Sequence, residues 1–138
     1  MEVLLNSLQW RIGRFRVTDE FLEWFRTMDA HSKELITVAI DRLAQMGPHL
    51  GRPLVDRIEG SQLHNLKELR PGSSGRSEVR ILFVFDPWRA AVLLTGGDKS
   101  GNWSGWYVHA IAEAERLYTD YLAERATAEE SQRKEGRS

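Results

Sequence analysis

The sequence predicts one α+β domain with a largely antiparallel sheet, and three observations lead to this fold class. Apolar residues alternate with basic ones over 10–17, and apolar residues then recur at helical spacing over 19–46. Short apolar runs separated by turn residues follow over 54–97, before a long helical pattern from residue 102. Strands that cluster in the sequence and are joined by tight turns favour an antiparallel sheet packed on helices.

The first strand is expected over 10–17, with a bulge at Gly13 where the alternation shifts. Thr18 precedes Asp19 and Glu20, which is the pattern of an N-cap followed by acids at the positive end of a helix. Apolar residues at i, i+3, i+4 and i+7 form the predicted buried stripe of this helix: Phe21, Trp24, Phe25 and Met28.

A second helix is expected over 32–46, and Gly47 and Pro48 end it. Its apolar face is predicted to comprise Leu35, Val38, Ala39, Leu43 and Met46. Because only a few residues join the two helices, we expect them to form an antiparallel hairpin.

The middle of the chain is predicted to form a meander of three strands, which completes a four-stranded sheet with the first strand: 64–70, 78–86 and 90–97. The segment 54–61 is either a short strand or an extended loop. Leu63, Leu66 and Leu69 have helical spacing, but the turn signal PGSSG at 71–75 favours a hairpin.

The C-terminal helix is expected to begin near Asn102 and to bury one apolar stripe: Ile111, Ala114, Leu117, Tyr118, Tyr121 and Leu122. Residues 126–138 have no apolar face, so we expect a disordered tail there. The domain is therefore expected to cover residues 1–125.

The composition is ordinary for a globular protein and fits a reducing compartment. The 138 residues include 41% hydrophobic and 28% charged side chains, no cysteine, and a net charge of −1. The lack of cysteine excludes disulfides and cysteine-ligated zinc. No apolar run is long enough for a membrane span, and the N-terminus lacks the pattern of a signal peptide. We therefore expect a cytoplasmic protein that does not bind a membrane.

The sequence contains no motif for a phosphate loop, a metal site or a serine nucleophile. The pieces GSSGRS and GGDKSG are rich in glycine, but neither fits the G-x-x-x-x-G-K-[ST] pattern of a phosphate loop. The four histidines lack metal-ligand spacing, and no G-x-S-x-G nucleophile elbow occurs. We expect neither a metal nor a cofactor.

Cationic residues gather around the predicted hairpin over 66–86. On a strand over 64–70, Glu68 and Arg70 share one face. Arg80 lies on the face of the partner strand opposite to its aromatic side chains, where Arg70 or Glu68 can approach it. Two interpretations remain open: a solvated cross-strand Arg–Glu pair, or a site for a negatively charged ligand.

Lys99 follows the last predicted strand and stands next to the aromatic stretch GNWSGWY. Trp103 lies at the first turn of the expected helix, where it can stack on a base, whereas Trp106 and Tyr107 are expected to pack at least partly in the core. His64 lies beside the basic hairpin.

The stretch over 47–103 contains LKELR, GR, RILF and GGDK in that order. It resembles the central region of the RelE/HigB toxins of bacterial type II toxin–antitoxin systems, within the RelE/ParE superfamily and particularly its HigB-type branch. The resemblance covers roughly residues 10–122, and it implies a RelE-like fold.

The resemblance also implies an activity. Such toxins enter the ribosomal A site and cleave mRNA there, which inhibits translation. The 2′-OH of one nucleotide attacks the adjacent phosphate, so a base, an acid and stabilisation of the charged phosphorane are required. Clustered cations supply these groups, because neighbouring cations lower the pKa of a lysine and arginines clamp phosphate. The implied partners are the ribosome, mRNA and a helix-turn-helix antitoxin. The toxin is expected to contact operator DNA only through this antitoxin.

Carried over by position, the resemblance implies a catalytic set and an RNA-binding set. Arg80 matches a phosphate-stabilising arginine, Lys99 a basic residue after the last strand, and Arg70 a basic position at a strand end. The remaining catalytic candidates are Lys67 and Glu68. The RNA-binding candidates are Arg76, Trp103, His64 and Tyr107.

Glu68 departs from the family pattern, because several RelE toxins have a lysine there. It is a general base, a partner that orients an arginine, or a sign of weakened activity. Two alternatives to the nuclease therefore stay open: a non-enzymatic toxin of the same fold (gyrase-binding like ParE, or active only in the antitoxin complex) and a housekeeping RNA-binding domain. A nuclease requires Arg70, Arg80 and Lys99 to converge, whereas a gyrase poison does not.

Overall fold

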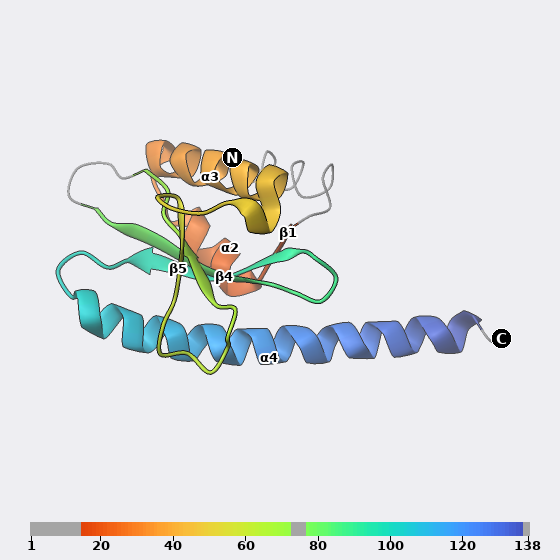
Figure 1. Cartoon of the computed structure of the whole chain (residues 1–138). Helices are drawn as coiled ribbons and strands as arrows, with labels where there is room; N and C mark the ends of the chain where they lie inside the picture. Colours follow the sequence, from red (N-terminus) through yellow and green to blue (C-terminus); the bar gives the residue numbers. More distant parts are fainter. Residues whose placement is uncertain (1–14, 73–76, 137–138) are drawn as a thin grey trace.

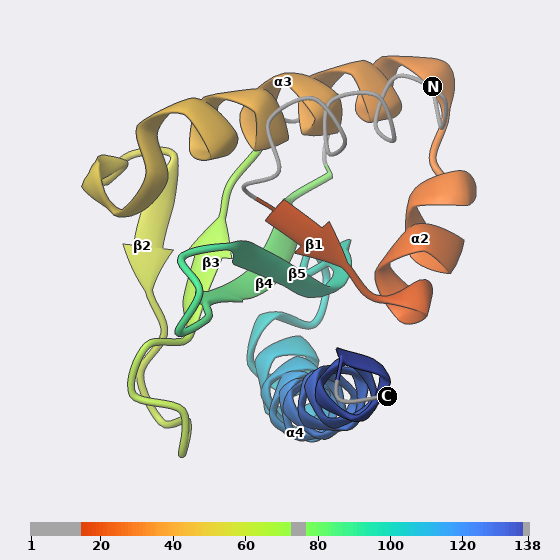
Figure 2. The same ribbon diagram turned by 90° about the vertical axis from the view of Figure 1, so that its right-hand side faces the viewer.

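The structure of the protein, a computed structural model, describes residues 15–72 and 77–136. These residues form three layers, with one sheet between two layers of helices (Figures 1 and 2). Helices α2 (Asp19–Arg26) and α3 (Ala30–Met46) pack on one face of the sheet, and α4 (Trp103–Gly136) runs along the other. The predicted α+β class is confirmed.

The sheet has five strands in the order β1-β5-β4-β3-β2. Their bounds are β1 (Phe15–Val17), β2 (Val55–Arg57), β3 (Lys67–Leu69), β4 (Val79–Phe85) and β5 (Ala91–Asp98). Strands β2 to β5 are antiparallel neighbours, as expected, whereas β1 pairs with β5 in parallel. The prediction of four strands was wrong in detail. The segment 54–61 supplies the edge strand β2, and the long path from β1 to β5 permits the parallel pairing.

The predicted helix boundaries near residues 18 and 47 are confirmed. The Thr18 side chain accepts a hydrogen bond from the backbone N–H of Phe21, and α3 ends at Gly47, whose φ is 59°. A 3₁₀ turn, Gly47–His49, follows. The predicted antiparallel hairpin is wrong, because α2 and α3 run in clearly different directions (Figure 2).

The buried face of α3 differs from the predicted one. Leu43 is buried as expected, but Val38 and Met46 are 60% and 48% exposed. Ile36 and Ile40 are buried in their place. Residues 36, 40 and 43 lie at i, i+4 and i+7, so they form one continuous stripe toward the sheet.

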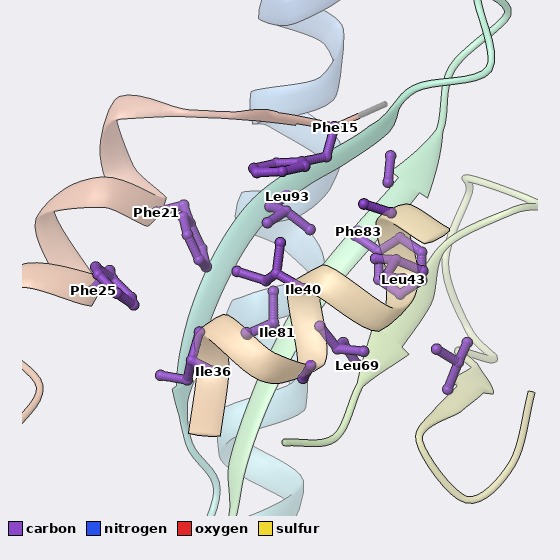
Figure 3. Close-up of a cluster of buried hydrophobic side chains, with 14 of the residues drawn as sticks. Phe15, Phe21, Phe25, Ile36, Ile40, Leu43, Leu69, Ile81, Phe83 and Leu93 are labelled. Carbon is purple, nitrogen blue, oxygen red and sulfur yellow. The ribbon is translucent and has the colours of Figure 1, made fainter. Parts of the chain in front are cut away.

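Two apolar clusters form the core, one on each face of the sheet. Ile81 and Phe83 of β4 belong to the cluster under α2 and α3, which Figure 3 shows. Leu82 and Val84 belong to the cluster under α4. Side chains alternate along a strand, so the alternation over 79–85 predicts this division correctly.

Two glycines of β5 allow a tryptophan to pack against each face of the sheet. A Cβ atom on Gly96 would lie 2.4 Å from Trp24 of α2, and one on Gly97 would lie 2.4 Å from Nε1 of Trp106 of α4. Successive residues of a strand point to opposite faces, so two glycines in a row make room on both. The contact of Trp106 with Gly97 holds the first turns of α4 against the end of β5.

Helix α4 continues to Gly136, past the edge of the sheet (Figure 1). This differs from the disordered tail expected from residue 126. Ion pairs at i,i+4 spacing line this part of the helix: Arg125 with Glu129 at 4.0 Å, and Glu130 with Lys134 at 3.5 Å. Each such pair stabilises an exposed helix by roughly 0.2–0.5 kcal/mol. Within the described residues, no helix has the length and apolar character needed to cross a membrane.

Candidate functional site

A cavity of about 530 Å³ lies where β2 and β3 meet the first turns of α4. Its wall carries the cations Arg52, Arg57, Arg70 and Lys99. It also carries the carboxylates Asp56, Glu59 and Glu68, and the apolar or aromatic side chains Ile58, Trp103, Tyr107 and Ile111. A concave site of this size with a few convergent polar groups is typical of ligand binding.

Glu68 is the central carboxylate of this site and is only 3% exposed. The hydroxyl of Tyr107 donates to its two oxygens, at 2.5 Å from Oε1 and 2.9 Å from Oε2. Nε of Arg80 lies 3.4 Å from Oε1, and Nη2 of Arg70 lies 3.5 Å from Oε2. Two guanidinium groups and a phenol thus compensate the buried negative charge, as the removal of a charge from water requires.

Arg80 lies behind Glu68 and is not part of the cavity wall. Its side chain is 14% exposed, and Nη1 donates to the carbonyl of Val79 at 2.8 Å. Glu68 faces Leu82 in the β3–β4 register, so Arg80 reaches it diagonally across the ladder. The cross-strand Arg–Glu pair is therefore present, but the interpretation of a solvated face is wrong because α4 covers this side of the sheet.

Arg70 bridges two carboxylates that face each other across β2 and β3. Asp56 is the register partner of Glu68, and Nη2 of Arg70 lies 3.1 Å from Asp56 Oδ2. Like charges in directly opposite positions repel each other, so the guanidinium between them stabilises the arrangement. Hydrogen bonds from the backbone of Arg57 and the side chain of Arg52, together with the nearby guanidinium charges, hold the pKa of Asp56 below its usual range.

Lys99 directly follows β5 and is 9% exposed. Its Nζ lies 5.0 Å from the ring centre of Trp103 and 5.6 Å from that of Tyr107, both within cation–π distance. Burial lowers the pKa of Lys99, and the Arg80 charge lowers it further, against the opposing effect of nearby glutamates. A lysine with a lowered pKa exchanges a proton more readily near neutral pH.

Tyr107 and Trp103 have different roles in the wall. Burial and the hydrogen bond with Glu68 raise the pKa of Tyr107 to about 12, so its hydroxyl stays protonated and donates to the carboxylate. Trp103 is 59% exposed, and its ring meets that of Tyr107 edge-on at 5.5 Å. Trp103 therefore offers a ring face to a ligand, whereas the Tyr107 hydroxyl is engaged within the protein.

Some predicted site residues do not join this cavity. Lys67 lies on the opposite face of β3, where its Nζ is 5.4 Å from the ring centre of Phe85. His64 is exposed in the loop between β2 and β3 and is not part of the wall, and Arg76 lies outside the described residues. The predicted residues that do line the cavity are Glu68, Arg70, Lys99, Trp103 and Tyr107.

Sequence reasoning missed Arg52, Asp56 and Arg57. They lie in or just before the segment 54–61, whose status as strand or loop the local pattern leaves open. Only the pairing of β2 with β3 brings Asp56 opposite Glu68. The mixture of charged and apolar residues over 52–59 was the available signal, and by itself it does not distinguish a strand from a loop.

The side chains of the wall define what this cavity can bind. Arginine binds phosphate bidentately, an exposed indole stacks on a nucleobase, and a lysine with a lowered pKa transfers protons. In residues 15–72 and 77–136, no group of three or more His, Asp or Glu side chains is placed to hold a metal ion. The set suits a ligand that combines phosphate with an aromatic ring.

Comparisons with known families and proteins relate this chain to others. A model of the family described as "Phage derived protein Gp49-like (DUF891)" matches residues 23–119. The "Putative toxin HigB2" of Mycobacterium tuberculosis (strain ATCC 25618 / H37Rv) is 44% identical over 122 residues, which is 88% of this chain and 59% of that protein. The "Putative toxin HigB3" of the same organism is 47% identical over 100 residues, which is 72% of this chain and 85% of that protein. No solved structure matches the chain.

The chain spans less than two thirds of the length of HigB2, but most of the length of HigB3. The matched range 23–119 contains every residue of the cavity wall. It also covers more than half of the chain. The chain therefore belongs to the phage-derived Gp49-like (DUF891) family.

Proposed function

We propose that this chain is the toxin of a type II toxin–antitoxin system, a HigB-like member of the RelE/ParE superfamily that cleaves mRNA on the ribosome. The similarity to HigB2 and HigB3 supports the role of toxin. The observation that carries the nuclease activity is the cavity in which Lys99, Arg70 and the exposed Trp103 meet. In the cytoplasm, a helix-turn-helix antitoxin neutralises the chain and links it to operator DNA.

The proposed reaction needs only groups that transfer protons and stabilise charge. The 2′-OH of one nucleotide loses its proton and attacks the adjacent phosphorus. The bond between that phosphorus and the 5′ oxygen of the next nucleotide breaks, and the 5′ oxygen takes up a proton. The products are a 2′,3′-cyclic phosphate and a 5′-hydroxyl, so the step balances without a cofactor.

The wall residues fit these roles. Lys99 donates the proton that the leaving 5′ oxygen takes up, because burial and Arg80 lower its pKa toward the useful range. The proton of the 2′-OH passes to water. Arg70 stabilises the negative charge that develops on the phosphorane, since a guanidinium stays protonated and matches phosphate geometry. Trp103 stacks on a base next to the scissile bond.

Glu68 is an orienting residue in this proposal. Its two oxygens accept from Tyr107 and face Arg70 and Arg80, so it is poorly placed to take a proton from a substrate hydroxyl. Arg80 contributes to the site through this carboxylate and through its effect on Lys99, since it does not line the cavity.

The test is to induce the chain in bacteria and to map the 5′ ends of cellular mRNA by primer extension. The wild-type chain should arrest growth and produce new ends within translated codons. Lys99→Ala and Arg70→Ala should lose both effects. Arg42→Ala is the matched control, because Arg42 is exposed on α3, on the opposite side of the sheet.

Circular dichroism of each purified variant shows whether the fold is kept. Wild-type induction that leaves mRNA intact contradicts the nuclease. Cleavage by Lys99→Ala at the wild-type rate contradicts the role of Lys99 but leaves the nuclease in place.

A second candidate is a toxin of the same fold without nuclease activity, such as a gyrase poison of the ParE type. One observation favours it: Arg80 faces Glu68 instead of the cavity, which leaves fewer cations for a phosphate. This candidate predicts growth arrest with intact mRNA. If the purified chain inhibits DNA supercoiling by gyrase, it is a gyrase poison; if it does not, it acts only in the antitoxin complex.

A further inference from the structure

The β2 side of the cavity carries a second organised group of cations, centred on Asp56. Asp56 Oδ1 accepts a hydrogen bond from the backbone N–H of Arg57 at 2.8 Å and lies 3.2 Å from Nε of Arg52. Asp56 Oδ2 binds Nη2 of Arg70 at 3.1 Å. One carboxylate thus fixes the backbone of one arginine and the side chains of two others.

The proposed cleavage step does not use Arg52 or Arg57. The Arg52 side chain is 79% exposed, and Arg57 is exposed at the end of β2. Asp56 engages Arg52 through Nε, and the rest of the exposed Arg52 guanidinium keeps donors that a phosphate can accept from.

The sign of the charge in the cavity depends on these two arginines. Without them the wall carries Arg70 and Lys99 against three carboxylates, Asp56, Glu59 and Glu68. With Arg52 and Arg57 the wall carries four cations against three carboxylates. A nucleic-acid backbone binds to positively charged surfaces, so an anionic ligand of this cavity needs the charges of Arg52 and Arg57.

We propose that Arg52 and Arg57, held by Asp56, form a second phosphate subsite for single-stranded RNA. It binds the phosphate of a nucleotide that neighbours the one between Arg70 and Lys99. This inference takes its ligand class from the proposed function. Among the described strands, β2 stands at the edge of the sheet, so RNA that leaves the cavity on this side passes along that edge. Asp56 is the positioning residue of the subsite.

The test measures binding to the free full-length chain, apart from cleavage. The probe is a fluorescein-labelled RNA of about six nucleotides with methylated 2′ oxygens, a length within the usual site size for single strands. A labelled dinucleotide with one internal phosphate is the short probe. Fluorescence anisotropy gives the affinity of each probe over a series of salt concentrations.

Arg52→Ala and Arg57→Ala should each weaken the longer RNA by roughly three- to tenfold, and each should reduce the slope of log K against log salt by about 0.7. The affinity for the dinucleotide should not change. Arg42→Ala, which removes the same charge from the opposite side of the sheet, should leave both probes unaffected.

Asp56→Asn separates a positioning role from simple electrostatics. Removal of a carboxylate alone would tighten RNA binding, because it makes the cavity more positive. A positioning residue predicts the opposite, since Arg52 and Arg70 lose the anion that holds them. Tighter binding of the longer RNA by Asp56→Asn overturns this role.

Unchanged slopes in both arginine variants overturn the subsite, as does an equal loss for the long and short probes. Absence of measurable RNA affinity in the wild-type chain at low salt overturns it as well. Primer extension decides the proposed function independently. If the chain cleaves mRNA but the slopes are unchanged, the nuclease activity stands and the subsite is excluded. If the slopes fall as expected but mRNA stays intact, the subsite stands and the nuclease activity is excluded.

Discussion

The hydroxyl of Tyr107 on α4 donates to both oxygens of Glu68 on β3, at 2.5 and 2.9 Å. The two residues are 39 positions apart in the sequence. Arg70 and Arg80 contact Glu68 from the side of the sheet, whereas Lys99 directly follows β5 and Trp103 is the first residue of α4. This hydrogen bond is thus a direct polar link between the two halves of the candidate site.

Tyr107→Phe should destabilise the fold by about 1–3 kcal/mol, because it removes the hydroxyl donor of a buried carboxylate, which then keeps only its contacts with Arg70 and Arg80. Urea unfolding followed by circular dichroism measures the loss. Tyr118→Phe is the control, since the Tyr118 hydroxyl makes no hydrogen bond within the described residues and the loss there should be smaller. Equal losses in the two variants would show that the bond to Glu68 contributes little.

The same bond should make stability depend on alkaline pH. The pKa of Tyr107 rises from 10.0 to about 12 on folding, so the native state holds this proton more tightly than the unfolded chain does. The stabilisation is therefore complete below pH 10 and is lost as the pH rises through 12. The difference in stability between the wild type and Tyr107→Phe, measured by urea unfolding over that range, should shrink as the pH rises.

Glu68→Gln should alter both stability and the pH dependence of cleavage. Removal of the charge leaves Arg70 and Arg80 short of an anion, and the loss of one partner of a buried pair costs about 3–5 kcal/mol. Glu68 also opposes the lowering of the Lys99 pKa, so its neutralisation should lower that pKa further.

The measurement for Glu68→Gln is the rate of mRNA cleavage against pH in a purified translation system. The limb of the profile that reports Lys99 should move to lower pH. A profile that keeps its wild-type position, in a variant shown to be folded, would separate Glu68 from the titration of Lys99.

Gly97→Ala should destabilise the protein and reduce its activity together. The added Cβ would lie 2.4 Å from Trp106 Nε1, so the first turns of α4 must move away from β5. Overpacking of this kind costs about 1–3 kcal/mol. Gly96→Ala is the matched control, because it meets Trp24 on the other face at 2.4 Å and should destabilise without moving α4.

Thermal unfolding and RNA-binding assays distinguish these two glycine variants. Gly97→Ala should lose affinity for RNA in the fraction that remains folded, since Trp103 and Tyr107 lie on the displaced turns. An equal effect of the two variants on RNA affinity would mean that α4 is not held to the site by Trp106.

Tyr121→Phe should weaken the packing of the middle of α4 on the sheet without affecting the site. The Tyr121 hydroxyl donates to Asp86 at 2.6 Å, and Asp86 also accepts from the backbone N–H of Trp88 and Ala90. The loss of this donor should cost about 1–3 kcal/mol in urea unfolding, whereas mRNA cleavage by the folded protein should stay at the wild-type level. Loss of cleavage at full folding would connect this distant contact to the site.

Most of the fold follows from local patterns. The alternation over 79–85 separates Ile81 and Phe83 from Leu82 and Val84, and the structure places the two pairs on opposite faces of the sheet. The cap at Thr18 and the helix end at Gly47 follow from side-chain and backbone preferences that act within a few residues. The parallel pairing of β1 with β5 has no such local signal, because its partners are distant in the sequence.

The candidate site shows the same division. The sequence by itself determined that Glu68 and Arg70 share a face, and that Arg80 lies within reach of Glu68, because side chains alternate along strands. Only the tertiary structure decided that α4 covers this face, that Tyr107 binds Glu68, and that β2 brings Asp56 opposite it. These contacts join residues far apart in the chain, and hydrophobic periodicity, which is a local property, does not record them. Their physical effect is burial: Glu68, which would otherwise belong to an ordinary surface ion pair, becomes the central carboxylate of a cavity.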